Sequence, residues 1–326
     1  MTELVVATGD ELVRIRPQNH QWRAERLLSG RAMQCLVADP RKQGALYAGS
    51  HGEGIWKSTN GGDDWSRLEL AEADVFSLAV SPADGALYAG TEPSKLFVSR
   101  DEGRSWRELE SLQQIPSRPS WSFPPRPWTS HVRSIAPSPH HATLLLVGVE
   151  LGGVMRSDDG GATWNDHPLG AQKDVHTLAW HPTAPGRVYE AGGGGAAWSR
   201  DGGRSWQPAD NGRDRHYTWG LAIDPSDPDC WFVSANPSAR LAHYGTEPAA
   251  ACIYRWRGAG PWQALGDGLP QPLDSFPYVL EMSSDSLWAG LGDGRIYRSD
   301  DQGDHWELLD VHAERPECVL GLIVIP

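Results

Sequence analysis

Residues 157–164 read SDDGGATW, and this phrase recurs along the chain. Close copies are residues 58–65 (STNGGDDW), 99–106 (SRDEGRSW), 199–206 (SRDGGRSW) and 299–306 (SDDQGDHW). Together with Trp22 and Trp262, the final tryptophans form a series whose members lie 43, 41, 58, 42, 56 and 44 residues apart. Seven such units account for all 326 residues, so the sequence predicts a repeat fold that closes into one domain, residues 1–326.

One unit, residues 75–109, contains four short segments with alternating apolar residues: 75–81, 86–90, 96–99 and 106–109. Such segments are typical of half-buried strands, and the turn between the first two contains Pro82 and Gly85. The whole chain has 36 glycines and 25 prolines, which fits many tight turns. We therefore predict an all-β fold, a seven-bladed β-propeller with four-stranded antiparallel blades.

The two ends of the chain should close the ring. Residues 3–28 contain only three strand candidates, 3–8, 11–16 and 22–28, whereas residues 319–325 form a strand candidate with no unit of its own. We expect this C-terminal strand to join the N-terminal blade, because closure leaves no free sheet edge.

The repeated phrase has a mechanical role. Its Asp can accept backbone N–H groups within the turn, its Gly permits positive φ, and its Trp is expected to be buried between neighbouring sheets. The phrases resemble the Asp boxes, or bacterial neuraminidase (BNR) repeats, of sialidase-like β-propellers, and similar repeats occur in xyloglucanases, sortilin-type receptors and photosystem II assembly factors. Asn60 replaces the usual Asp of the first box, and His305 replaces the usual Thr or Ser of the last. The resemblance implies a fold rather than an activity, because the box belongs to the scaffold.

Composition excludes several classes of partner. The formal net charge of −13, without any stretch rich in Lys or Arg, argues against nucleic acid and anionic membrane surfaces. Residues 1–10 lack the basic region of a signal peptide, and the longest apolar runs, 142–149 and 319–326, are too short to span a bilayer. We expect a cytoplasmic protein whose four cysteines, which lack metal-ligand spacing, are free thiols.

One face of the ring should carry the function. The boxes connect the third and fourth strands of each blade, so the start of each first strand and the loop after each second strand lie on the opposite face. Both long intervals between tryptophans add insertions to that face, at residues 110–130 and 236–251. The proline-rich segment 117–130 (SRPSWSFPPRPWTS) is either a covering flap or a solvated linker, and its three bulky aromatic residues favour the flap.

The same face holds the candidate catalytic and metal-binding residues. A histidine paired with a carboxylate can act as general acid and base near neutral pH, and the candidates are His176, Asp174 and Glu150. Alternatively, neutral imidazoles could converge on a divalent metal, with Glu53 or Glu150 completing the shell; the candidates are His131, His176 and His216. Simple hydrogen bonding at the rim is the third alternative. Apart from this candidate metal, the cofactor is unknown.

Further residues of this face are candidates for ligand binding. Arg133 could clamp a carboxylate or phosphate, or instead pair with Asp74 or Asp174. Aromatic side chains could stack on a sugar or another ring, and the candidates are Trp128, Tyr217, Trp219 and Tyr278. The remaining polar candidates are His131, His216, His51 and Glu53. The glycine run at residues 192–195 should let a ligand or the flap approach the backbone closely.

The expected function is binding of a small polar or anionic, carbohydrate-like ligand at the channel mouth opposite the boxes, with glycosidase-like hydrolase or lyase activity. Residues 14–17 (RIRP) only echo the Arg-Ile-Pro motif of sialidases, and the full sialidase set cannot be placed, so we do not expect a true sialidase. One alternative is a noncatalytic scaffold that binds a protein partner, as assembly factors do. Another is a metal-dependent propeller enzyme with a histidine-lined site.

Overall fold

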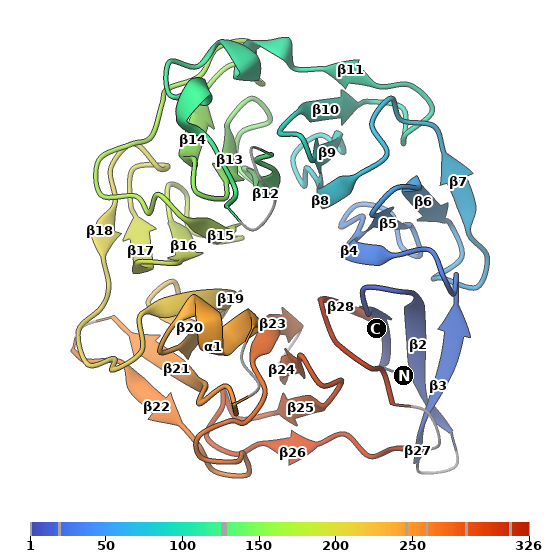
Figure 1. The fold of residues 1–326 in the computed structure, drawn as a ribbon, viewed down its shortest axis with the longest axis vertical. Coiled ribbons are helices and arrows are strands. Elements are labelled where there is room, and N and C mark those ends of the chain that lie inside the picture. The colour runs from blue at the N-terminus through green and yellow to red at the C-terminus, as the bar shows by residue number, and fades with distance from the viewer. Residues whose placement is uncertain are drawn as a thin grey trace.

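The computed structural model describes residues 2–18, 21–124, 129–244, 247–258, 260–283, 286–312 and 315–325. Within these residues, seven sheets stand around a central axis as the blades of a propeller (Figure 1). In six blades the neighbouring strands are antiparallel and follow one another in the sequence, as expected for segments joined by short turns, whereas the N-terminal blade also takes strands from the C-terminal part of the chain. The predicted all-β, seven-bladed propeller is therefore confirmed.

The blades share one strand order from the axis outward. The N-terminal blade contains β28 (Gly321–Ile325), β1 (Glu3–Ala7), β2 (Leu12–Gln18) and β3 (Gln21–Leu27), with the short β27 (Val311–His312) parallel to β3. The other six blades, in chain order, are β4 (Met33–Ala38), β5 (Leu46–Ser50), β6 (Gly54–Ser58), β7 (Ser66–Leu68); β8 (Val75–Val80), β9 (Leu87–Thr91), β10 (Leu96–Ser99), β11 (Arg107–Glu108); β12 (Val132–Pro137), β13 (Leu145–Val149), β14 (Gly153–Ser157); β15 (Val175–Trp180), β16 (Val188–Gly192), β17 (Gly195–Ser199), β18 (Gln207–Pro208); β19 (Tyr217–Ile223), β20 (Cys230–Asn236), β21 (Cys252–Arg257), β22 (Gln263–Leu265); and β23 (Pro277–Ser283), β24 (Ser286–Leu291), β25 (Ile296–Ser299), β26 (Glu307–Leu308).

Two blades depart slightly from four strands. In the blade of β12 to β14, the fourth strand is reduced to a single bridge between Arg156 and Asn165. In the N-terminal blade, β28 pairs with β1 in a register that places Leu4 opposite Val324. The C-terminal strand thus becomes the innermost strand of the first blade, which confirms the predicted ring closure.

Neighbouring blades approach each other through a repeated small-to-large contact. A glycine in the second strand of four blades faces a valine in, or just before, the innermost strand of the next; these pairs are Gly49–Val75, Gly90–Val132, Gly148–Val175 and Gly290–Val319. A Cβ atom added at any of these glycines would lie between 2.2 and 2.7 Å from the valine side chain. Glycine therefore sets how closely the sheets can pack.

All five repeated phrases make the same turn. The serine hydroxyl accepts the N–H of the glycine four residues later at 2.7 to 2.9 Å and donates to the Asn or Asp two residues later over the same range. The side chain and backbone N–H of Thr163, the Ser157 hydroxyl and the backbone of Ala162 make hydrogen bonds to Asp159. These bonds lower the pKa of Asp159 to about 2. The turn is therefore a local device that orders the connection between the third and fourth strands.

The tryptophans of the series are less uniformly buried than the sequence predicts. Trp206, Trp262 and Trp306 have exposed fractions of 5%, 4% and 1%, whereas four others are only half-buried: Trp22, Trp65, Trp106 and Trp164. All seven tryptophans lie on or just before an outer strand, so this position alone does not bury the ring. Trp164 donates its indole N–H to Ser111 Oγ at 3.0 Å and packs against the edge of a core cluster.

Both insertions contribute short helices. The first contains two 3₁₀ turns, Glu110–Gln114 and Arg118–Ser120, and its Trp121 is 4% exposed and packs with Leu112. The described part of this insertion is thus packed against the blades, while Trp128 lies outside the described residues. The second insertion contains α1 (Ala239–His243), which begins after the capping residue Ser238. In the described part of the chain, no helix has the length and apolarity needed to cross a membrane. All four cysteines are free, as predicted.

We expect Trp306→Ala to lower the free energy of unfolding by about 3–5 kcal/mol, because it empties a fully buried site between blades. Trp164→Ala should cost clearly less, since that ring is half-buried. Urea unfolding followed by circular dichroism would measure both values. Equal losses of unfolding free energy in the two variants would show that the degree of burial does not determine how much each tryptophan stabilises the fold.

Candidate functional site

A β-bulge near the start of six innermost strands places one side chain at the channel mouth. Each strand register shifts there by at least one residue, for example between Val132 and Ser134. A bulge re-aims the extra residue, which would otherwise alternate into the space between the sheets. The residues within these register shifts that face the axis are Gln34, Phe76, Arg133, His176, Trp219 and Tyr278.

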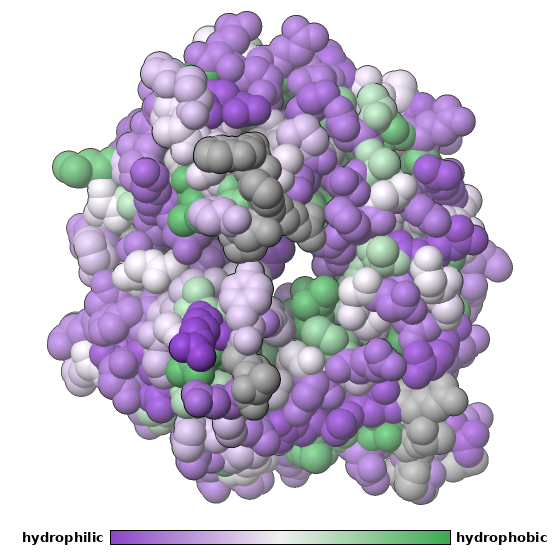
Figure 2. All heavy atoms as spheres, viewed as in Figure 1, coloured by the Kyte–Doolittle hydropathy of each residue, from purple (hydrophilic) through white to green (hydrophobic). Residues whose placement is uncertain are grey.

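These side chains surround a cavity of about 530 Å³, here named the mouth cavity. Its lining residues are Gln34, Phe76, Phe123, Pro124, His131, Arg133, Glu150, Leu151, Asp174, Tyr217, Trp219, Ala239, His243, Tyr244, Tyr278 and Leu320. Figure 2 shows the central opening on this face of the ring. Beneath it, a channel of about 340 Å³ is lined by the innermost strands and by His176.

Most of the predicted site residues meet in this region. The mouth cavity is lined by Arg133, His131, Glu150, Asp174, Tyr217, Trp219 and Tyr278, and His176 lies just below them. At the last blade, Leu320 lines the cavity, and the C-terminal strand begins at Gly321, two residues later than its pattern indicates. Both insertions contribute to the lining as well, through Phe123 and His243.

Three predicted residues lie elsewhere. His51 and Glu53 form ion pairs on the outer rim, His51 Nδ1 with Asp74 at 3.0 Å and Glu53 with Arg31 at 2.9 Å. His216 is exposed and does not line the mouth cavity. The predicted cluster of His131, His176 and His216 is therefore not assembled, because Tyr217 and Trp219, not His216, turn toward the axis.

A buried ionic network forms one side of the cavity. His131 Nε2 lies 2.7 Å from a Glu150 oxygen, and His131 Nδ1 lies 3.5 Å from Glu92. Burial opposes ionisation of both partners, but their contacts outweigh it: the pKa of His131 is raised above its ordinary 6.5, and that of Glu150 is lowered to about 2. The pair is thus an imidazolium and a carboxylate at mildly acidic pH.

Arg133 occupies the centre of the mouth. Its guanidinium carbon lies 4.5 Å from the Trp219 ring centroid, and its Nε lies 3.9 Å from Glu150. Arg133 thus contacts Trp219 and Glu150 in place of the predicted alternative, a pair with Asp74 or Asp174. The Trp219 ring is also 4.2 Å from the His176 ring. Trp219 therefore supports two functional side chains, which limits its use as the predicted stacking surface.

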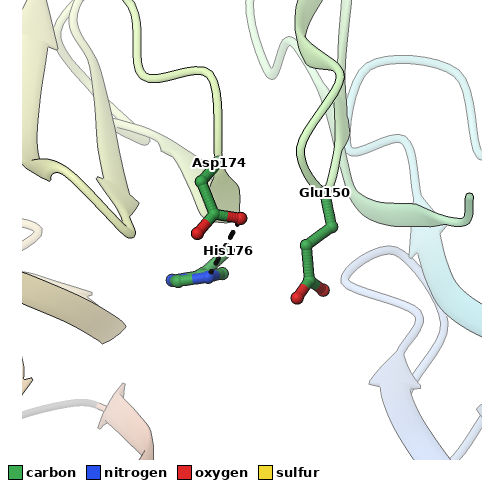
Figure 3. Close-up of side chains that lie close together, drawn as sticks. All are labelled: Glu150, Asp174 and His176. Carbon is green, nitrogen blue, oxygen red and sulfur yellow. Dashed lines mark ion pairs between the residues drawn. The ribbon is translucent and has the colours of Figure 1, made fainter. Parts of the chain in front are cut away.

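Asp174, His176 and Glu150 point into the same space between two blades (Figure 3). His176 Nδ1 lies 2.6 Å from the carbonyl oxygen of Thr218, and since a carbonyl only accepts, Nδ1 carries the proton. His176 Nε2 lies 3.5 Å from Asp174 Oδ1, and neither atom makes a hydrogen bond within the described chain. The three residues predicted to act in catalysis are thus adjacent, with a free imidazole lone pair among them.

The glycine run explains how Asp174 reaches this position. A Cβ atom at Gly193 would lie 2.0 Å from Asp174 Oδ2, and one at Gly192 would lie 2.4 Å from the Asp174 carbonyl oxygen. The segment that approaches the run is therefore the loop carrying Asp174, not the flap. Buried Glu190 accepts the N–H of Gln172 at 3.0 Å and anchors the same loop, and burial raises the pKa of Glu190 to about 8.

Sequence reasoning missed the residues that α1 contributes. His243 lies between two phenols, with Nε2 at 2.7 Å from Tyr217 Oη and Nδ1 at 2.9 Å from Tyr278 Oη. Burial of the ring is the main cause that lowers the pKa of His243 to about 4. Tyr244 is 63% exposed at the rim of the mouth cavity. In the sequence, the only indication that His243 and Tyr244 belong to the site is that they lie in an insertion.

The arrangement can hold polar groups and move a proton. Arg133 offers a cationic donor, Glu150 and Asp174 offer carboxylate acceptors, and His176 Nε2 can take a proton or a cation. Aromatic rings form much of the remaining wall. A cavity of this size and lining is typical of small-molecule sites.

Comparison with known proteins places the fold but no family. No known family pattern and no curated protein matches this sequence. Among solved structures, an ancestral GH74 enzyme superposes with a TM-score of 0.66 at 22% identity, over 84% of this chain and 38% of that one. The GH74 xyloglucanase of Xanthomonas campestris gives 0.66 at 19% identity, over 93% and 46%. A chain of a nidogen–laminin complex gives 0.56 at 10% identity, over 100% and 99%.

These similarities establish a propeller fold shared with glycoside hydrolases and with proteins of other kinds. This chain spans less than half the length of each GH74 chain.

The His131–Glu150 pair predicts a defined pH profile of stability. Glu150 has a lowered pKa, so its contribution is complete above its ordinary 4.5 and is lost as pH falls toward about 2. His131 has a raised pKa, so its contribution is complete below 6.5 and is lost as pH rises beyond its folded value. The stability difference between wild type and the double variant His131→Ala/Glu150→Gln should therefore be greatest between pH 4.5 and 6.5.

The single variant His131→Ala leaves the Glu150 carboxylate buried without its imidazolium, and should cost about 3 kcal/mol at neutral pH. Adding Glu150→Gln should recover part of this loss. Urea unfolding across the pH range measures all three proteins, and a pH-independent difference would contradict the ion pair.

Proposed function

We propose that this protein binds a small carbohydrate-like molecule in the mouth cavity, and that it acts on this ligand as a hydrolase or lyase. One observation carries the proposal. Four buried polar atoms that make no hydrogen bond in the described chain gather at the mouth cavity and the top of the channel: His131 Nδ1, Arg133 Nε, Asp174 Oδ1 and His176 Nε2. Buried polar atoms normally have hydrogen-bond partners, so a cluster whose only contacts among the described residues are ion contacts of 3.5 to 3.9 Å indicates a place for a polar ligand.

The chemistry of the cavity favours a polyhydroxylated ligand. Carboxylates accept from hydroxyl groups, and a guanidinium donates to hydroxyl or carboxylate oxygens. Exposed Tyr244 and the flap residue Phe123 offer aromatic surface at the rim, which suits the apolar face of a sugar ring. The volume of about 530 Å³ suits one or two sugar units rather than a long polymer.

The floor of the cavity supports the proposed reaction class. Hydrolysis and elimination both need groups that deprotonate or polarise a ligand oxygen. Asp174, His176 and Glu150 provide such groups on one side of the mouth. Two of the similar structures are GH74 enzymes, one of them a xyloglucanase, and this supports glycosidase-like chemistry.

The alternative of a protein-binding scaffold has less support. The exposed large hydrophobic residues of the described chain are Leu169, Tyr244 and Leu308, and they come from three separate regions of the ring. They form no continuous apolar patch of the kind that marks a protein interface. The mouth is a lined cavity rather than a flat platform.

Ligand binding can be tested with soluble mono- and oligosaccharides, including xyloglucan fragments, by saturation-transfer NMR and calorimetry. Arg133→Ala removes a charged hydrogen bond and should weaken binding by about 10- to 100-fold. His51→Ala is the matched control, because it removes a rim side chain outside the cavity. If no sugar binds, or if Arg133→Ala binds as tightly as wild type, the proposal is wrong.

The reaction itself calls for a separate measurement of products released from any sugar that binds. Glu150→Gln keeps the size of the side chain but removes its charge, and should slow turnover by about 100-fold or more. Unchanged turnover in this variant would show that the group of Asp174, His176 and Glu150 takes no part in the reaction. The proposal of ligand binding in the mouth cavity would still stand.

A further inference from the structure

We propose that His176, Asp174 and Glu150 form a binding site for one divalent first-row metal ion, such as Zn²⁺ or Mn²⁺. Among the described residues, they are the one group of three metal-ligating side chains whose ligand atoms all lie within 4.8 Å of one another. One imidazole and two carboxylates form a donor set that suits these ions. The role of the metal ion rests on the proposed function, whereas binding of the cation is a property of the protein alone.

The first argument is the state of His176. Its side chain is fully buried, and its Nδ1–H donates to the Thr218 carbonyl at 2.6 Å. This fixes the tautomer and leaves a lone pair on Nε2, which has no hydrogen-bond partner in the described chain. A backbone carbonyl that orients the far side of the ring is the usual support of a metal-binding histidine.

The second argument is the gap between His176 and Asp174. A neutral Nε2 and a carboxylate oxygen both present lone pairs, so a positive charge belongs between them, either a proton or a metal ion. A charge-assisted hydrogen bond would bring the atoms to about 2.7–2.9 Å. They are 3.5 Å apart without hydrogen-bond geometry. Two ligands of a tetrahedral zinc lie about 3.4 Å apart, given metal–ligand distances near 2.0–2.1 Å.

The third argument is support for the two carboxylates. Glu150 accepts a hydrogen bond from His131 Nε2 at 2.7 Å, which orients the carboxylate. Asp174 occupies space that exists because residue 193 has no side chain. Such outer contacts are what holds metal ligands in place. The three ligand atoms lie within 4.8 Å of one another, so the Glu150 carboxylate would move by up to about 1.4 Å if metal ligands are to lie roughly 3.4 Å apart.

Charge balance also favours a cation. The carboxylates of Asp174 and Glu150 face the site together with the guanidinium of Arg133. The two proposed carboxylate ligands thus outnumber the one guanidinium in the lining. Three protein ligands leave at least one coordination position open toward the cavity. A ligand hydroxyl would bind there.

The test uses the full chain, stripped with a chelator and then titrated with Zn²⁺ by calorimetry and with Co²⁺ by visible absorption. Wild type should bind one equivalent, and the Co²⁺ spectrum should report nitrogen and oxygen ligands. Asp174→Asn and Glu150→Gln should each weaken binding by more than 100-fold. Gly193→Ala, which displaces Asp174 without altering any ligand, should weaken it by about 10- to 100-fold. His51→Ala, an exposed histidine beside the Asp74 carboxylate, should bind like wild type.

Two results would overturn the inference. One is wild-type protein that binds none of Zn²⁺, Mn²⁺ and Co²⁺, which would assign the gap to a proton. The other is binding that survives both Asp174→Asn and Glu150→Gln, which would place the ion elsewhere. Sugar binding is measured separately on stripped and loaded protein. A protein that binds sugar but none of the metal ions refutes this inference alone, and a protein that binds metal but no sugar refutes the proposed function alone.

Discussion

The extra residue near the start of each innermost strand is the constraint on which the mouth depends. In an unbroken strand, side chains alternate between the two faces of the sheet, and both faces of a blade are covered by neighbouring blades. A bulge interrupts this alternation and turns one side chain to the axis. Because the interruption recurs in six blades, the axis collects six unlike side chains from positions far apart in the sequence. The chemistry of the mouth can therefore vary while the packing between blades stays the same.

The two faces of the disc differ in how their polar groups are satisfied. The repeated turns satisfy their own backbone groups through serine and aspartate side chains, so that face is locally complete. The opposite face ends in polar atoms that are not satisfied, and its ionic network is held by neighbouring blades. His176 is oriented by Thr218 of the next blade, and His131 is joined to Glu150 within its own blade and to Glu92 of the preceding one. The order of the site therefore depends on closure of the ring.

The repeat made much of this predictable. Placing the start of each first strand on one face found Arg133, His176 and Trp219, because the bulge occurs at the same place in six units. The start of the C-terminal strand was predicted two residues too early, since that strand has no box or turn to set its register. The partners of the ion pairs were harder to predict from the sequence. Whether Arg133 meets Asp74, Asp174 or Glu150 depends on how adjacent blades are rotated, and sequence spacing does not encode that rotation. His243 was missed because insertions carry no repeat to align.

The position of α1 over the mouth follows from a chain of hydrogen bonds whose direction can be derived. Tyr278 Oη donates to the Ala242 carbonyl at 3.1 Å, so its oxygen must accept from His243 Nδ1–H at 2.9 Å. A neutral imidazole has one proton, which leaves His243 Nε2 to accept from Tyr217 Oη at 2.7 Å. Every group in the chain is used once, and the low pKa of His243 keeps the ring neutral in this role. The insertion is therefore fastened to β19 of its own blade and to β23 of the next blade, beside the opening, and its position depends on the contact between these two blades.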